Sequence, residues 1–324
     1  MEQSEKAEVT GRGYERRKRI FEIYSNQLTL LVSNGLVSGI NLPFDKTYLC
    51  PICLRPFSAS DLSDDAPNML TLEDAPPKSL GGRASVLTCK SCNSTCGHEI
   101  DFHLTERLIE LDARSFLPNT ETKVKVTNKG STVQGKVEVD STGGIKVTHH
   151  EKINHPIKLE SYISGTGKGS SVYVEFPKSR VDAHRLEVAL LKSAYILAFA
   201  KFGYSFILDP VYDIVREQLK NPDKDVYPEG FWTKQDFAKE HEGVHLITES
   251  GLAGFFSIFS LNTGSKTTRF GCYLPIPNKN PHEVVKTLKT MTGGFSLSLD
   301  ATPGDFLADL NRIKELRDWI DKLR

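Results

Sequence analysis

The sequence predicts an α+β protein in which a small cysteine-bearing module, built as two strands and a helix, precedes a larger α+β domain. Three observations support this fold class. Two C-x-x-C pairs lie in the N-terminal third of the chain, segments of alternating hydrophobicity follow residue 118, and the last twenty residues carry an apolar helical stripe. The chain has 324 residues, a length that suggests two domains.

The order of elements suggests where the domains divide. We expect a helical segment over residues 1–47, the cysteine module over 48–118, and the α+β domain over 119–324. A helix over 12–34 ends at Asn34-Gly35. Within the module the expected order is knuckle, strand, loop, strand, knuckle and helix.

The C-terminal half alternates between strand-like and helix-like patterns. Residues 165–169 (Gly-Thr-Gly-Lys-Gly) are interpreted as a hairpin turn rather than a phosphate-binding loop. The apolar stripe of the last helix is interpreted as a core face. Expected strands are 123–126, 136–139, 145–148, 171–176, 244–248, 255–260, 270–274 and 295–299, and expected helices are 181–202, 209–220, 281–291 and 303–323.

Charge and hydropathy narrow the possible partners. Lys plus Arg and Asp plus Glu each number 41, so any nucleic-acid contact must come from a local basic patch. The basic run Arg16-Arg-Lys-Arg19 either contacts phosphates or forms a solvated helix face. The apolar segment 189–208 has a membrane span's length, but Lys192 and Lys201 lie about 180° apart around a helix. We therefore expect a buried helix, no membrane partner and a cytoplasmic location.

The two C-x-x-C pairs, Cys50 with Cys53 and Cys89 with Cys92, have metal-ligand spacing. Four thiolates close a tetrahedral zinc site and leave no position open for water, so the predicted zinc is structural. The other two cysteines, Cys96 and Cys272, are expected to be buried thiols.

The residues between the knuckles indicate a family. The stretch Leu70-Thr-Leu-Glu-Asp-Ala-Pro-Pro-Lys-Ser-Leu-Gly-Gly82, followed by Leu87-Thr-Cys-Lys-Ser-Cys-Asn93, resembles the HNH (ββα-metal) endonucleases. The resemblance covers roughly residues 48–105 and implies a ββα-metal fold for the module. It implies that Glu73 and Asn93 hold a catalytic divalent ion. Asp74 stands where the family usually has the histidine that activates water.

Simple chemistry constrains these roles. Mg²⁺ prefers oxygen ligands and would neutralise charge at a scissile phosphate. An ordinary Asp is a weak base near neutral pH, so Asp74 has a raised pKa, or is a second metal ligand, or marks an inactive site. His98, five residues after Asn93, is either catalytic or a surface residue. Three basic residues near this site either contact phosphates or are solvated: Lys78, Arg83 and Lys90.

The resemblance yields a leading hypothesis and two alternatives. The leading hypothesis is a metal-dependent DNA endonuclease with structural Zn²⁺ and catalytic Mg²⁺, in a setting such as bacterial defence against foreign DNA. The first alternative is a catalytically dead zinc-containing module that binds DNA or RNA beside a partner. The second is a zinc-stapled interaction protein without a nucleic-acid role. Residues 119–324 would serve targeting, sensing or homo-oligomerisation.

Overall fold

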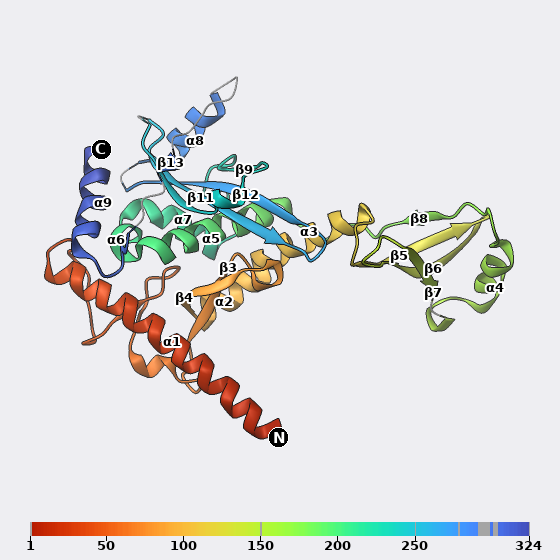
Figure 1. Ribbon diagram of the computed structural model, residues 1–324, viewed down its shortest axis with the longest axis horizontal. Helices are drawn as coiled ribbons and strands as arrows, with labels where there is room; N and C mark the ends of the chain where they lie inside the picture. The colour runs from red at the N-terminus through yellow and green to blue at the C-terminus, as the bar shows by residue number, and fades with distance from the viewer. Residues whose placement is uncertain are drawn as a thin grey trace. The chain divides into compact units, whose positions relative to one another are not determined.

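The computed structural model describes residues 2–149, 151–249, 251–277, 279–290, 299–300 and 304–323, with side chains from residue 11 to 290 and from 304 onward. The chain divides into two units (Figure 1). Unit 1 comprises residues 1–103, 183–261 and 268–324, and unit 2 comprises residues 104–182 and 262–267. This division differs from the expected boundaries at 48–118 and 119–324, because the cysteine module shares one core with the later helices of unit 1.

Helix α1 (Glu2–Ser33) begins earlier than the expected residue 12. Its inner face is apolar, and Tyr24 stacks on Phe199 with ring centroids 4.8 Å apart. The buried Gln27 amide donates to the carbonyl oxygens of Phe202 (2.9 Å) and Phe306 (2.7 Å). The helix ends at Ser33, and the turn after it contains Gly35, whose φ of 66° suits glycine.

The cysteine module follows α1 in the expected order. Strands β1 (Tyr48–Leu49) and β2 (Pro56–Phe57) flank the first knuckle. Strands β3 (Leu70–Ala75) and β4 (Arg83–Cys89) form an antiparallel hairpin. Helix α2 (Lys90–Cys96) then begins directly after β4, and it continues through a π-helical turn, η3 (Gly97–Asp101), into α3 (Phe102–Arg114).

Helix α5 (Ala183–Phe202) is the central helix of unit 1, followed by α6 (Tyr204–Ile207) and α7 (Asp213–Lys220). From Val188 to Phe202 it is buried on almost every side, as expected. Within the described ranges no helix is both long and apolar enough to cross a membrane. The continuous apolar run therefore reflects a core helix.

A five-stranded sheet covers α5, with the strand order β13-β10-β11-β12-β9 (Figure 1). The ring of Phe202 contacts that of Phe255, and Ser257 Oγ donates to the Ala194 carbonyl oxygen at 3.3 Å. Helix α9 carries the expected buried stripe, with Ile313, Leu316 and Ile320 in the core. Residues 295–298 of the expected strand 295–299 lie outside the described residues. The bounds are β9 (Trp232–Lys234), β10 (Gly243–Ile247), β11 (Gly254–Asn262), β12 (Thr267–Pro275), β13 (Leu299–Asp300), α8 (Pro281–Thr290) and α9 (Leu310–Lys322).

Unit 2 contains an antiparallel sheet in the order β7-β6-β5-β8. Alternating valines of its strands pack against Leu159 and Tyr162 of α4 (Pro156–Gly165). This helix was not expected: Gly165 is its last residue and residues 166–169 follow it, so residues 165–169 do not form a hairpin turn. The strands are β5 (Thr120–Asn128), β6 (Ser131–Val139), β7 (Ile145–His149) and β8 (Tyr173–Glu175).

Candidate metal centre and acidic hairpin

The four predicted cysteines converge as expected. The Sγ atoms of Cys50, Cys53, Cys89 and Cys92 all lie within 4.8 Å of one another, and those of Cys53 and Cys89 are 3.8 Å apart. Tetrahedral zinc with Zn–S bonds of about 2.3 Å requires sulfur atoms about 3.8 Å apart. The four thiols therefore fit a structural metal such as zinc.

The first knuckle is shaped by its backbone. Leu54 N–H donates to the Cys50 carbonyl oxygen at 2.8 Å, and Cys50 N–H donates to the Arg55 carbonyl oxygen at 3.1 Å. Leu54 adopts a positive φ of 54°, which turns the chain after Cys53 so that the Arg55 carbonyl oxygen faces the Cys50 N–H. The Cys89 N–H points at Cys50 Sγ at 3.5 Å, which joins the second knuckle to the first.

Two buried tyrosines connect the first knuckle to the helical core. Tyr195 of α5 donates its hydroxyl proton to the Pro51 carbonyl oxygen at 2.7 Å. The Tyr204 hydroxyl donates to the Leu49 carbonyl oxygen (2.7 Å) and accepts from the Leu49 N–H (2.8 Å). The cysteine cluster is thus part of the core of unit 1.

The remaining cysteines are buried, as predicted. Burial raises the pKa of the Cys96 thiol and that of the Cys272 thiol. A raised pKa keeps a thiol protonated and unreactive, so both behave as core residues.

The loop between β3 and β4 is held by close backbone contact. Gly81 has a φ of 86°, and Gly82 lies so close to Pro76 that an added Cβ would sit 1.5 Å from the Pro76 carbonyl oxygen. The Pro-Pro-Lys-Ser-Leu-Gly-Gly sequence therefore fits this one turn, and it returns β4 alongside the acidic end of β3.

Glu73, expected to be a metal ligand, is buried in an ion pair. Its Oε1 lies 2.5 Å from Lys192 Nζ, both side chains are 2% exposed, and Oε2 accepts from Thr88 Oγ1 at 2.7 Å. Lys192 Nζ also lies 2.5 Å from Asp101 Oδ2. A divalent ion at Glu73 would have to displace this ammonium, so the residues as arranged do not fit the catalytic ion implied by the resemblance.

The charges of this buried group are coupled. Burial alone would lower the pKa of the Lys192 ammonium, but the carboxylates of Glu73 and Asp101 raise it overall, so the lysine stays charged. Burial raises the pKa of Asp101 to about 6, with Glu73 adding to the shift and Lys192 opposing it. The group therefore holds one permanent cation between two acids.

Asp74 differs from Glu73 because it is only half-buried. The ladder register shifts between the two residues: Glu73 lies opposite Val86 and Asp74 opposite Ala84. Such a bulge re-aims side chains. Burial and the charge of Glu73 raise the pKa of Asp74, while Lys78, Arg16 and Lys192 lower it. Of the three options open for Asp74, the raised pKa is the one with support here.

Arg16 of α1 supplies a cation beside Asp74. Its guanidinium donates to the carbonyl oxygen of Ala84, which is the ladder partner of Asp74. Arg17 donates to the Leu62 carbonyl oxygen at 3.0 Å and pairs with Asp64 at 2.6 Å. Two residues of the basic run thus attach α1 to the module, while the three basic residues predicted near the site are exposed: Lys78, Arg83 and Lys90.

Asn93 and His98 have different settings. The Asn93 amide donates to Thr71 Oγ1 (2.9 Å) and to the Leu72 carbonyl oxygen (3.0 Å), so it joins α2 to β3. His98 is exposed on the π-helical turn. Asn93 thus has a structural role. His98 is exposed and is not part of the buried group of Glu73, Asp101 and Lys192.

Sequence reasoning missed two members of that group, Lys192 and Asp101. A signal existed for Lys192, since a lysine inside a buried apolar helix needs a carboxylate partner. Nothing in the sequence singled out Asp101 as that partner.

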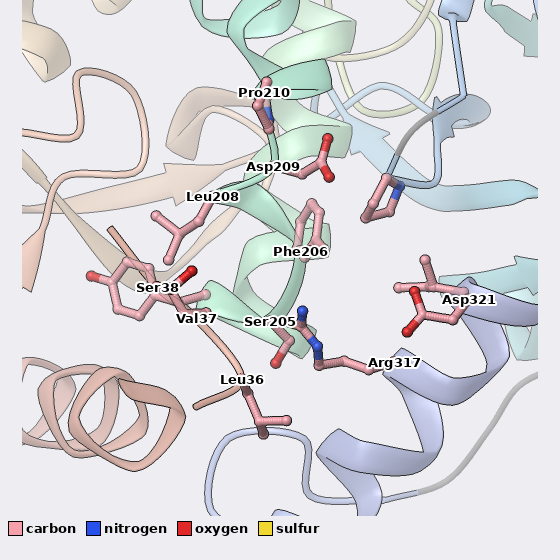
Figure 2. Close-up of a pocket in the computed structure, with 13 residues that line it drawn as sticks. Leu36, Val37, Ser38, Ser205, Phe206, Leu208, Asp209, Pro210, Arg317 and Asp321 are labelled. Carbon is pink, nitrogen blue, oxygen red and sulfur yellow. The ribbon is translucent and has the colours of Figure 1, made fainter. Parts of the chain in front are cut away.

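A separate pocket of about 220 Å³ lies in unit 1 (Figure 2). Its wall includes Leu36, Phe206 and the acidic Asp209 and Asp321, and Arg317 of α9 extends into it. None of the site residues predicted from the sequence lines this pocket. It is therefore distinct from the hairpin of β3 and β4, which carries Glu73 and Asp74, and from the cysteine cluster.

Comparisons of the chain with protein-family models, with curated proteins and with solved structures find no match.

Proposed function

We propose that the chain is a nucleic-acid-binding protein whose zinc-stapled module contacts the phosphodiester backbone at the hairpin formed by β3 and β4. The observation that carries the proposal is the setting of Asp74, a half-buried acid whose ladder partner Ala84 accepts a hydrogen bond from the Arg16 guanidinium. Burial raises the pKa of Asp74, and the charges of Lys78 and Arg16 oppose this larger effect. Cationic side chains of this kind bind phosphate groups. A single nearby carboxylate can orient those side chains while the local surface stays positively charged.

The neighbouring charges extend the surface. Arg83 begins β4, next to Ala84, and Lys90 begins α2. Both are exposed, and the structure places no carboxylate within ion-pair distance of either among the described residues. Because the chain as a whole is neutral, binding would depend on this local set and would weaken steeply with salt.

Binding of a labelled 30-base-pair DNA duplex, its single strands and the matching RNA tests the proposal by fluorescence anisotropy. The double charge reversal Lys78→Glu with Arg83→Glu should weaken binding at least about tenfold. A matched control reverses two exposed lysines elsewhere, Lys168 and Lys286, and should bind like the wild type. Equal affinity of both double variants for nucleic acid would show that the hairpin is not part of the binding interface.

An HNH-type DNA endonuclease is the second candidate, favoured by the raised pKa of Asp74. A carboxylate with a raised pKa accepts a proton from water more readily than an ordinary Asp. The resemblance makes defence against foreign DNA a plausible setting. Nicking of supercoiled plasmid that depends on added Mg²⁺ or Mn²⁺, stops with EDTA and is lost in Asp74→Asn would support this enzyme. Absence of nicking by folded wild type would leave the binding function alone.

A further inference from the structure

The buried group at Glu73 already contains a cation. Lys192 Nζ lies 2.5 Å from Glu73 Oε1 and 2.5 Å from Asp101 Oδ2, and it reaches both from the middle of α5. The Lys192 side chain is 2% exposed, so water does not screen these contacts. An ammonium thus lies against the acid to which the HNH resemblance would assign a divalent ion.

The remaining atoms of the group leave little room for a metal ligand set. Glu73 Oε2 accepts from Thr88 Oγ1 at 2.7 Å, so both of its oxygens are engaged. Asp101 Oδ1 is buried and has no hydrogen-bond partner among the described residues, so it remains free, but it supplies only one ligand atom. Mg²⁺ demands close to six oxygens in octahedral geometry, and a like charge nearby would repel it.

We propose that Lys192 is the resident cation of this site: its ammonium positions Glu73 and Asp101 and keeps divalent ions away from Glu73. The side chain does not reach the surface, so Lys192 is a positioning residue. The proposal deepens the proposed function by making nucleic-acid engagement at the hairpin independent of a divalent ion at Glu73. Only this link to nucleic-acid binding rests on the proposed function. The role of Lys192 itself is tested by cation binding, which is measured without nucleic acid.

Mn²⁺ binding to the zinc-loaded full chain tests this directly, with free Mn²⁺ followed by its electron paramagnetic resonance signal. We expect wild type and Glu73→Gln to take up Mn²⁺ equally weakly. Lys192→Met, which removes the ammonium and keeps a long side chain, should bind Mn²⁺ at least about tenfold more tightly than wild type. The gain should disappear in the double variant Lys192→Met with Glu73→Gln.

Two results would overturn the proposal. One is Mn²⁺ uptake by wild type that is abolished in a folded, zinc-loaded Glu73→Gln, and this comparison holds even if Lys192→Met fails to fold. The other is a folded Lys192→Met, with native zinc content and circular dichroism, that gains no Mn²⁺ affinity. Failure of the proposed function is separate, because it would appear as lost DNA and RNA binding with these Mn²⁺ results unchanged.

Discussion

Lys192 of α5 and Glu73 of β3 form a buried ion pair, with 2.5 Å between Nζ and Oε1 and both side chains 2% exposed. The pair joins the hairpin to the central helix of unit 1. Removing one partner of a buried pair leaves an uncompensated charge, whereas the pair itself contributes little beyond its own desolvation cost. Replacing one partner of the pair should therefore lower the free energy of unfolding by much more than the pair as a whole contributes.

Glu73→Gln should lower the free energy of unfolding by about 3–5 kcal/mol, because Lys192 would keep only Asp101 as its counter-ion. Urea denaturation measures the change. Glu315→Gln breaks the exposed pair between Arg312 and Glu315 and serves as the control, with little expected effect. A Glu73→Gln protein as stable as the control would show that the buried pair does not form in solution.

Asp101 should make stability depend on pH. Its pKa is about 6 in the folded chain and about 3.9 when unfolded, so between these values the native state keeps a proton that the unfolded chain has lost. The free energy of unfolding should then fall by about 3 kcal/mol as pH rises from about 4 to about 6. Asp101→Asn should remove this component, which denaturation of both proteins across that range would reveal. Identical pH profiles would contradict the assignment.

Zinc should be essential for unit 1 because the knuckles share its core. Structural zinc contributes on the order of 10–16 kcal/mol in small zinc-finger peptides. We expect one zinc per chain by elemental analysis, and loss of zinc together with cooperative folding in Cys53→Ser. Cys272→Ala removes a buried thiol outside the cluster and should keep its zinc. Full zinc content in Cys53→Ser would exclude the four-cysteine site.

Gly82→Ala should open the loop between β3 and β4, because the added Cβ would overlap the Pro76 carbonyl oxygen. The expected cost is about 1–3 kcal/mol, measured by thermal or urea unfolding. Gly97→Ala is the matched control: nothing lies within 4 Å of its Cβ position and its backbone is helical. Equal stability of the two variants would mean that the loop adopts another course.

Local patterns predicted the features that depend on neighbouring residues. The spacing of Cys50, Cys53, Cys89 and Cys92 predicted the cluster, and the apolar run after residue 188 predicted a buried helix. Helix α4 escaped prediction because it buries only Leu159 and Tyr162, too few residues for a helical period. The partnership of Lys192 with Glu73 and Asp101 depends on tertiary folding, which no local spacing encodes.

The salt dependence of nucleic-acid binding tests the central claim most directly, since it counts phosphate contacts. The slope of log K against log salt changes by about 0.9 for each contact to duplex DNA. If Lys78 and Arg83 both touch phosphates, the slope of the Lys78→Gln, Arg83→Gln double variant should be shallower than that of wild type by about 2. An unchanged slope, with the variant folded and zinc-loaded, would contradict the claim that this hairpin binds the phosphodiester backbone.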